Sequence, residues 1–541
     1  MAGAGRHGIR TVAALLGALL AVTACVSSKA GIPAPHGKPE VADTFPPDGD
    51  DGTPGGPGSP PAVFTEQTLD WAECGAPTPL QGSGPAPGGP WRCAELTVPL
   101  DHSRPEGETL GIALIRAEAT GSRSRVGSLV FNFGGPGGSG VAALPRMGER
   151  FDRLREAYDL VSFDPRGVGE SAGVICLDDE ELDAATQDSD RSHPRTPAQE
   201  AAFLDRKQEY AAACRANAGD LLPHLTTVAT ARDLDLLRHV LGDSKLHYYG
   251  ASYGTKLGGV YAGLFPERVG RTVFDSVVDP TSDLVGRSLA HTAGFQLALD
   301  NYFTDCAERY GPDCPTGSGP AQGNEILAGL LAGLDREPLP TGSGRELTQS
   351  LAVTGVLASL YSENLWPVLT EALRQALDRR DGGQLLAAAD RYNGRDQLGR
   401  YRNLHSANTA INCADFASRP GIEDVHRHRP EFAEISPVFG EYLVWNLLSC
   451  TAWPVTGERD QPHVRAPGAR PILLIATTGD PATPYAGAER MQQELGEDVG
   501  VLLTYDGDGH GAFSSGNACV RTAVHAHLLS GATPEDGMIC T

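Results

Sequence analysis

The sequence predicts an α/β protein with a doubly wound, mostly parallel sheet of eight strands and a large, mainly helical cap between the sixth and seventh strands. Short apolar runs alternate with helical patterns along the chain, as in α/β folds. Several runs are nearly continuous Val, Leu, Ile and Phe, which is typical of parallel strands buried on both faces. Between the sixth and seventh runs lie roughly 190 residues of mostly helical pattern, too many for a loop.

The expected elements follow from these runs and define the domain organisation. A helical pattern, ARDLDLLRHVLG, precedes the fifth run. We expect a catalytic body at residues 65–280 and 471–541 and the cap at 281–470. The eight expected strands are residues 95–100, 110–117, 128–133, 158–164, 245–249, 271–278, 471–476 and 499–505.

The N-terminal region has the features of an export signal. An apolar run at 11–22 follows two arginines and ends in VTAC, with Cys25 after a small residue. This pattern resembles a bacterial lipoprotein signal peptide at 1–24, with the lipid on Cys25. Ordinary secretion, with Cys25 in the discarded peptide, is the alternative. Residues 25–64 are rich in Pro, Gly and Asp and predict a flexible tether. We therefore expect an extracytoplasmic protein that is lipid-anchored or secreted.

The cysteines agree with export. Eleven are present, and setting Cys25 aside leaves an even number in a compartment where disulfides persist. There is no C-x-x-C pair, so we expect no structural zinc site. No cofactor is expected either. Proximity in sequence suggests the pairs Cys74–Cys93, Cys176–Cys214, Cys306–Cys314, Cys413–Cys450 and Cys519–Cys540.

The formal charge of −24 argues against nucleic acid or an anionic membrane surface as the main partner. Membrane association is expected through the lipid anchor alone. Nothing in the composition fixes the oligomeric state.

A G-x-S-x-G pattern occurs twice, around Ser252 and around Ser171. A nucleophilic serine on a strand-to-helix elbow must follow a strand directly and open a helix. Ser252 meets this condition, because the run KLHYY precedes it and a helical stretch follows. The strand before Ser171 ends at Asp164, several residues earlier. Ser252 is therefore the predicted nucleophile, and the second match is predicted to be a loop feature.

A serine nucleophile needs a base and an orienting carboxylate, which follow it in this order along such folds: Ser, acid, His. Asp480 comes directly after the seventh run and is the predicted acid; Asp506 and Asp508 are rivals in the next loop. His510 follows the last long run and is the predicted base. His525 and His527, in a helical stretch, are expected to have packing or surface roles.

Acyl transfer also needs donors for the developing oxyanion. One predicted donor is the backbone N–H of Tyr253, directly after the nucleophile. The other is expected from the loop GGPGGSG at 134–140, which follows the third run. A plain glycine-rich turn is the alternative for this loop taken alone.

These motifs together resemble those of secreted α/β-hydrolases of the tripeptidyl aminopeptidase group, which is related to proline iminopeptidases. The motifs are GGPGGSG (134–140), DPRGVGES (164–171), GASYGT (250–255), TTGDPATP (477–484) and GHG (509–511). The resemblance implies an α/β-hydrolase fold, Gly135 as the second oxyanion donor, and removal of short peptides or single residues from free N-termini. Proline iminopeptidases have His where Phe133 stands, which favours the tripeptidyl group.

An exopeptidase of this kind must hold the substrate's α-ammonium group, for which a carboxylate in the cap is suited. Glu363 and Asp415 stand among aromatic residues of the insertion and are the candidates. The expected partner is a peptide or polypeptide with a free N-terminus. An esterase or lipase using the same three residues, and a non-catalytic ligand-binding lipoprotein, remain as alternatives.

Overall fold

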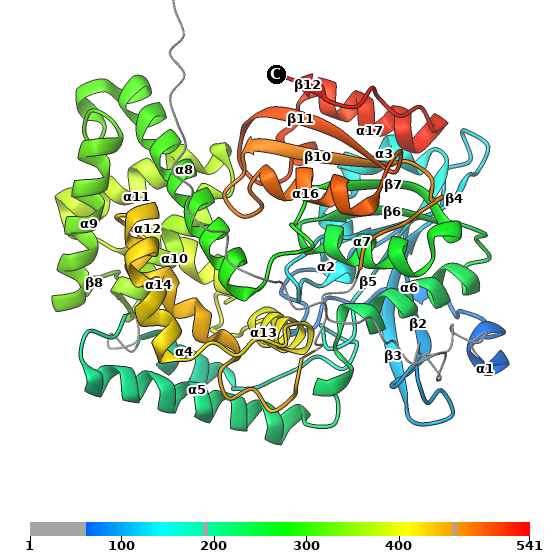
Figure 1. Ribbon diagram of the computed structural model, residues 1–541, viewed down its shortest axis with the longest axis horizontal. Coiled ribbons are helices and arrows are strands. Elements are labelled where there is room, and N and C mark those ends of the chain that lie inside the picture. Colours follow the sequence, from blue (N-terminus) through cyan, green and yellow to red (C-terminus); the bar gives the residue numbers. More distant parts are fainter. Residues whose placement is uncertain (1–60, 188–192, 458–462) are drawn as a thin grey trace, which may run out of the picture. The chain divides into compact units, whose positions relative to one another are not determined.

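The computed structural model describes residues 61–187, 193–457 and 463–541, and they contain a ten-stranded sheet in the order β1-β2-β3-β5-β4-β6-β7-β10-β11-β12 (Figure 1). All eight expected strands are confirmed. They are β2 (Trp91–Pro99), β3 (Thr109–Ala117), β4 (Gly127–Asn132), β5 (Tyr158–Phe163), β6 (Leu246–Ala251), β7 (Val269–Asp275), β10 (Ile472–Gly479) and β11 (Gly500–Asp508).

The sheet is parallel from β5 to its far edge, and β2 and β3 pair antiparallel at the other side. β7 pairs directly with β10, although the whole cap separates them in sequence. The carboxyl ends of β4, β6, β7, β10 and β11 therefore meet at one edge, where ligands bind in open α/β sheets.

Two short edge strands add to the eight predicted ones. They are β1 (Ala72–Glu73) and β12 (Met538–Cys540). Two or three residues cannot display a strand's two-residue period, so sequence patterns do not reveal them. A disulfide lies beside each: Cys74–Cys93 joins the β1 end to β2, and Cys519–Cys540 joins β12 to helix α17 (Ala518–Ser530).

Helices cover both faces of the sheet. On one face Phe131, Val273 and Ile475 pack against α2 (Gly140–Met147), α3 (Asp152–Arg155) and α17 (Ala518–Ser530). On the other, Tyr248 and Leu474 pack against α6 (Thr227–Val240), α7 (Tyr253–Leu264) and α16 (Ala486–Leu495). This double covering explains why the central strands read as continuous apolar runs.

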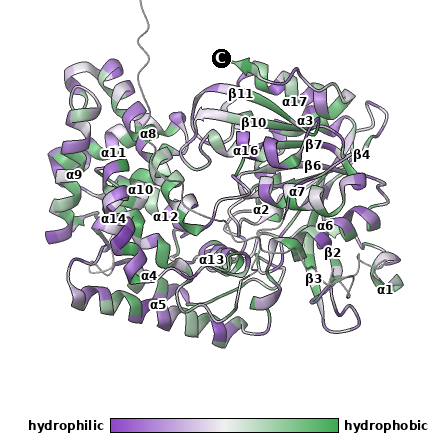
Figure 2. Cartoon of the chain, viewed as in Figure 1, coloured by the Kyte–Doolittle hydropathy of each residue, from purple (hydrophilic) through white to green (hydrophobic). Residues whose placement is uncertain are grey.

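The segment between β7 and β10 is helical, as predicted, and has a hydrophobic core of its own. Helices α9 to α12 gather into one body (Figure 1), and their mixed polar and apolar faces are visible in Figure 2. The helices are α8 (Leu284–Tyr310), α9 (Pro320–Arg336), α10 (Gln349–Leu360), α11 (Trp366–Arg379), α12 (Gly383–Asn393), α13 (Leu404–Asp415), α14 (Ile422–Ile435) and α15 (Gly440–Leu443), with a small hairpin of β8 (Leu339–Pro340) and β9 (Glu346–Leu347).

A second helical excursion, between β5 and α6, was not separated from the catalytic body in the sequence. It contains α4 (Asp179–Gln187) and α5 (Pro197–Ala218). Phe203 of α5 packs with Val425 of α14 and with Trp445, so this excursion joins the cap. The long, polar α5 buries few residues, so its sequence pattern does not predict that it packs against the cap.

All five predicted disulfides are confirmed. They are typical of an extracytoplasmic protein. In the part of the chain that the structure describes, no helix has the length and apolar character needed to cross a membrane. The predicted signal peptide, Cys25 and most of the tether lie outside the described residues; the chain is already folded at α1 (Ala62–Thr65), where Phe64 is buried.

Candidate active site

Ser252 stands on a sharp turn between β6 and α7. Its φ of 56° and ψ of −124° belong to a backbone conformation that non-glycine residues rarely adopt. Gly250 and Gly254 permit close approach: a Cβ on Gly250 would lie 2.4 Å from the carbonyl oxygen of Gly254, and one on Gly254 would lie 2.4 Å from that of Asn132. Thus the strained residue is the serine itself, and the glycines give it room, as in a nucleophile elbow.

Ser171, in the second G-x-S-x-G, is fully buried in a loop. Its hydroxyl donates to the carbonyl oxygen of Asp164 at 2.6 Å and accepts from the backbone N–H of Ala113 at 2.9 Å. The hydroxyl of Ser171 uses both its donor and its acceptor in hydrogen bonds within the fold, so it is not available as a nucleophile.

The glycine loop after β4 lies directly against the elbow. A Cβ on Gly134 would lie 2.9 Å from Cβ of Ser252 and 3.2 Å from the backbone nitrogen of Tyr253. Gly135, with φ of 118°, comes next in the loop. Tyr253 opens α7, and the first N–H groups of a helix lack intrahelical acceptors. The two predicted oxyanion donors therefore belong to segments in contact.

Asp164, the first residue of the DPRGVGES motif, had no predicted role at the site; it fixes the far end of this loop. Its buried carboxylate accepts from the hydroxyl of Ser139 at 2.6 Å and from the N–H of Val141 at 3.1 Å. Gln81 donates to its other oxygen. Burial raises the pKa of Asp164 despite these hydrogen bonds.

Asp480 and His510 form the hydrogen-bonded pair that their order in the sequence predicts. Nδ1 of His510 lies 2.9 and 3.0 Å from the two carboxylate oxygens of Asp480. Asp480 is 1% exposed and also accepts from the N–H groups of Ala482 and Thr483. Burial by itself would raise its pKa, but the His510 charge and the hydrogen bonds hold that pKa below its usual range.

The same pair shifts the histidine in the opposite direction. Burial would lower the pKa of His510, but the Asp480 carboxylate outweighs it and raises that pKa above its ordinary value. The result is an imidazole whose Nδ1–H is held by a carboxylate, which leaves Nε2 as the proton acceptor.

The end of β7 connects the turn at Ser252 to the loop after β11 that carries His510, called here the histidine loop. The N–H of Ser252 donates to the carbonyl oxygen of Asp275 at 3.0 Å, and the Asp275 carboxylate accepts from the N–H groups of Ala512 and Phe513. Ser276, at φ 57°, accepts from the N–H of Gly511 at 2.7 Å. One sequence signal for these residues was not used: an acid, Asp275, within the apolar run 271–278.

Ser252 and the His510 ring are not hydrogen bonded to each other within the described chain. Catalytic hydrogen bonds are often long in the free enzyme and tighten when substrate binds.

The cap reaches the histidine through Tyr361, at the end of α10. The N–H of His510 donates to the carbonyl oxygen of Tyr361 at 2.8 Å. The two rings meet edge to face, with centroids 5.4 Å apart. Sequence patterns could not predict this contact, because the two residues lie far apart along the chain.

Glu363, a candidate for binding the substrate amine, is exposed in the short turn after Tyr361, η6 (Glu363–Leu365). Its backbone nitrogen lies 3.7 Å from the position that a Cβ on Gly509 would occupy, so it stands beside the histidine loop. Burial, followed by the charges of Asp508 and Asp305, raises the pKa of Glu363.

Asp415, the other candidate, is 3% exposed at the end of α13. It forms an ion pair with Lys256 of α7 at 2.8 Å and accepts from the N–H and hydroxyl of Thr227. Its oxygens are thus already occupied by groups of the fold. Asp415 joins α13 of the cap to the helix that follows the nucleophile, and we do not assign it to the substrate amine.

The sheet order, the serine elbow and the buried Asp–His pair at the same sheet edge define an α/β-hydrolase of the serine hydrolase class. A family described as "TAP-like protein" matches residues 436–540.

Known proteins are similar to nearly the whole chain. Serine protease Hip1 of Mycobacterium tuberculosis is 39% identical over 88% of this chain and 91% of its own length. Tripeptidyl aminopeptidase of Streptomyces lividans is 30% identical over 87% and 86%, and carboxylesterase B of M. tuberculosis is 35% identical over 83% and 86%. The chain belongs to this family of α/β-hydrolase serine peptidases.

Proposed function

We propose that this protein is an exported serine exopeptidase that removes short peptides or single residues from free N-termini through an acyl-enzyme. The observation that carries the proposal is the buried Asp480–His510 hydrogen bond at the sheet edge where Ser252 stands on its strained turn. Relatives named serine protease and tripeptidyl aminopeptidase support the peptidase assignment.

The reaction follows from the geometry. His510 Nε2 takes the proton of the Ser252 hydroxyl as Oγ attacks the scissile carbonyl carbon. The N–H groups of Gly135 and Tyr253 stabilise the resulting oxyanion. His510 then protonates the leaving amine, the C–N bond breaks, and the N-terminal fragment stays esterified to Ser252. Water, deprotonated by His510, hydrolyses this ester and frees the serine.

Recognition of the free N-terminus needs a carboxylate close to the catalytic residues. Glu363 is the remaining candidate, because it is exposed next to the histidine loop and close to the acidic Asp508. A negative group at this position would attract the α-ammonium of a substrate. Neutralising it in Glu363→Gln should raise KM for peptides with a free N-terminus and leave an N-blocked ester unaffected.

Export and anchoring complete the proposal. The signal-like N-terminus, with Cys25 as the lipid acceptor, and the Pro/Gly-rich tether support a catalytic body held at the outer face of a bacterial membrane. Replacing Cys25 by Ser should move the protein from the membrane fraction to the medium.

The deciding experiment compares wild type with Ser252→Ala on a tripeptide anilide with a free N-terminus. We expect turnover to be lost in the variant while the circular dichroism spectrum is unchanged. Ser171→Ala is the matched control: it should lower the melting temperature, by loss of two buried hydrogen bonds, and keep the activity. Near wild-type turnover by Ser252→Ala would contradict the assignment of Ser252 as the nucleophile.

Two further substrates separate the alternatives. Blocking the N-terminus of the anilide should abolish turnover in an aminopeptidase, whereas a p-nitrophenyl ester preferred over every peptide would favour an esterase, the activity named for the carboxylesterase B relative. A fluorophosphonate probe that fails to label Ser252 would favour a non-catalytic binding protein.

A further inference from the structure

One face of α8 borders the catalytic residues, and this face carries the positively charged side chain of Arg287. Arg287, His291 and Phe295 are four residues apart along α8 and share that face. Phe295 contacts the ring of Tyr361, which in turn contacts His510. The charges of His510 and Asp480 act on His291, as does that of Arg287.

Arg287 has an unusual shortage of partners. The described residues supply one hydrogen-bond acceptor for its five N–H groups: Oδ1 of Asn412, 2.7 Å from Nη1. Its guanidinium lies over the ring of Phe416, 4.6 Å from the centroid. No carboxylate of the described chain lies within 4 Å of its nitrogens. Asp415, the one anion that acts on its pKa, is bonded to Lys256.

Two cations and one anion therefore surround Phe416. Lys256 lies 5.0 Å from the centroid of the same ring, and Asp415 balances a single positive charge. The remaining guanidinium nitrogens of Arg287 are not among the buried nitrogens that lack a partner, so solvent reaches them. An excess positive charge with free donors is thus accessible at this point.

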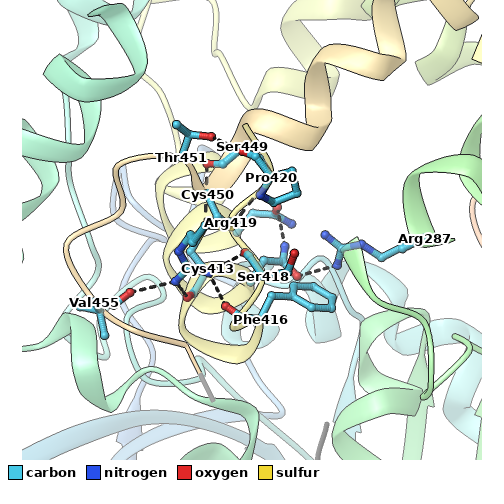
Figure 3. Close-up of a disulfide and its surroundings, with 12 residues drawn as sticks. Arg287, Cys413, Phe416, Ser418, Arg419, Pro420, Ser449, Cys450, Thr451 and Val455 are labelled. Atoms are coloured by element: carbon cyan, nitrogen blue, oxygen red, sulfur yellow. Dashed lines mark hydrogen bonds between the residues drawn. A yellow bond between two sulfur atoms is a disulfide. The ribbon is translucent and has the colours of Figure 1, made fainter. Parts of the chain in front are cut away.

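Arg419 lies near the Cys413–Cys450 disulfide and provides a contrast to Arg287 (Figure 3). Its guanidinium donates to the carbonyl oxygens of Cys413 and Val455, each at 2.8 Å, and to that of Phe416. These neutral acceptors tie the chain together after α13. Arg287 approaches from α8 and has no such set of carbonyls.

The position of Arg287 is costly for stability. Although solvent reaches the free nitrogens, burial lowers the pKa of Arg287 to about 10, so its charged form is less well solvated than on an open surface. It also lies in the first turn of α8, where the helix dipole is positive and disfavours a cation. A substrate anion would offset both effects.

A chain of side-chain amides links Arg287 to the glycine loop at 134–140, which carries one predicted oxyanion donor (the oxyanion loop). Asn412 accepts from Arg287 and donates to Oδ1 of Asn408 at 2.9 Å. Asn408 donates to the carbonyl oxygen of Pro136 at 3.0 Å. α13 also packs on this loop so closely that a Cβ on Gly137 would lie 2.6 Å from the carbonyl oxygen of Leu404. The guanidinium is therefore held at a fixed place relative to the reacting carbonyl.

We propose that Arg287 is a binding residue for a carboxylate of the peptide substrate. This inference rests on the proposed peptidase function. The carboxylate has two possible sources, the C-terminus of a short peptide or an Asp or Glu side chain. A guanidinium with free donors binds either through paired, charge-assisted hydrogen bonds.

The test compares matched peptides on purified full-length enzyme. One pair is a pentapeptide of neutral residues with a C-terminal acid or amide; the other pairs carry Asp or Asn at one position. For wild type we expect kcat/KM to be at least about tenfold higher for the acid member of one pair, the worth of a charge-assisted bond. The pair that shows the preference identifies the source of the carboxylate.

The variants then assign the preference to Arg287. In Arg287→Gln the acid-to-neutral ratio should fall to about one, and Arg287→Lys should give an intermediate ratio. The ratio cancels any loss common to both peptides, and the preference should reside in KM. Arg419→Gln, the control, should lower the melting temperature and keep the wild-type ratio.

Three outcomes overturn the inference. A wild type that treats both members of every pair alike has no carboxylate site. A preference that survives in Arg287→Gln belongs to another residue. If wild type cleaves neither member of any pair, the proposed peptidase function fails, and this inference fails with it; cleavage of the neutral peptides distinguishes the first two outcomes from the third.

Discussion

The backbone N–H of His510 donates to the carbonyl oxygen of Tyr361 at 2.8 Å, and the two rings meet edge to face. This contact joins the cap to the loop that carries the predicted base. Movement of α10 would therefore move His510. The helical segment between β7 and β10 is thus in direct contact with the predicted base.

Truncating Tyr361 tests this coupling. Tyr361→Ala removes the ring that packs on His510 and Phe295, and we expect kcat to fall about tenfold or more because the imidazole loses its orientation. Tyr361→Phe keeps the ring and should stay near wild type. Tyr392→Ala, which removes a neighbour of Tyr361, is the control. Steady-state kinetics on the tripeptide anilide give the result; an unchanged kcat in Tyr361→Ala would contradict the coupling.

The pH profile of kcat/KM should report the Asp480–His510 pair. The base must be neutral to accept the serine proton, and the carboxylate raises the pKa of His510 above its ordinary value. Activity should therefore rise with pH through an inflection above about 6.5, the usual histidine value. In Asp480→Asn the inflection should move down and kcat should fall by about 10³ to 10⁴. An inflection that stays in place in this variant would dissociate Asp480 from the base.

Neutralising Asp415 should act on stability. Asp415→Asn leaves Lys256 buried without its counter-charge, which costs about 3–5 kcal/mol. Chemical denaturation should show this loss. Lys256→Met with Asp415→Leu, which removes both charges, should recover part of it. A raised KM for free N-termini in Asp415→Asn, with unchanged stability, would instead restore Asp415 as the amine site.

Asp275 should matter for the rate because its buried carboxylate is bonded to the loop that follows His510. Its carboxylate holds the N–H groups of Ala512 and Phe513 and accepts from the hydroxyl of Tyr249. Asp275→Asn presents an amide to donors and should displace the histidine loop, so kcat should fall and KM should change little. Tyr249→Phe, which removes one of the three donors, should have a smaller effect. A KM-only change would contradict this positioning role.

The sequence by itself determined the parts whose signals are local. Apolar runs marked all eight long strands. The central strands β4, β5, β6, β7 and β10 show no polar alternation because both of their faces are buried. The serine elbow could be distinguished from its duplicate because only Ser252 follows a strand directly. The order of Ser252, Asp480 and His510 and the pairing of nearby cysteines also need no three-dimensional information.

Tertiary structure alone decided the rest, because it depends on which residues meet across the chain. Asp415 and Glu363 look alike in sequence, yet Asp415 is paired with Lys256 of α7, whereas Glu363 is exposed beside Gly509. Within the described residues Arg287 has no carboxylate partner, because Asp415, the acid whose charge acts on it, is already bonded to Lys256. The pattern of residue types along the chain indicates which residues are buried and whether they recur with the period of a helix or a strand. It does not indicate which residue pairs with a buried charge, because that depends on how distant segments pack.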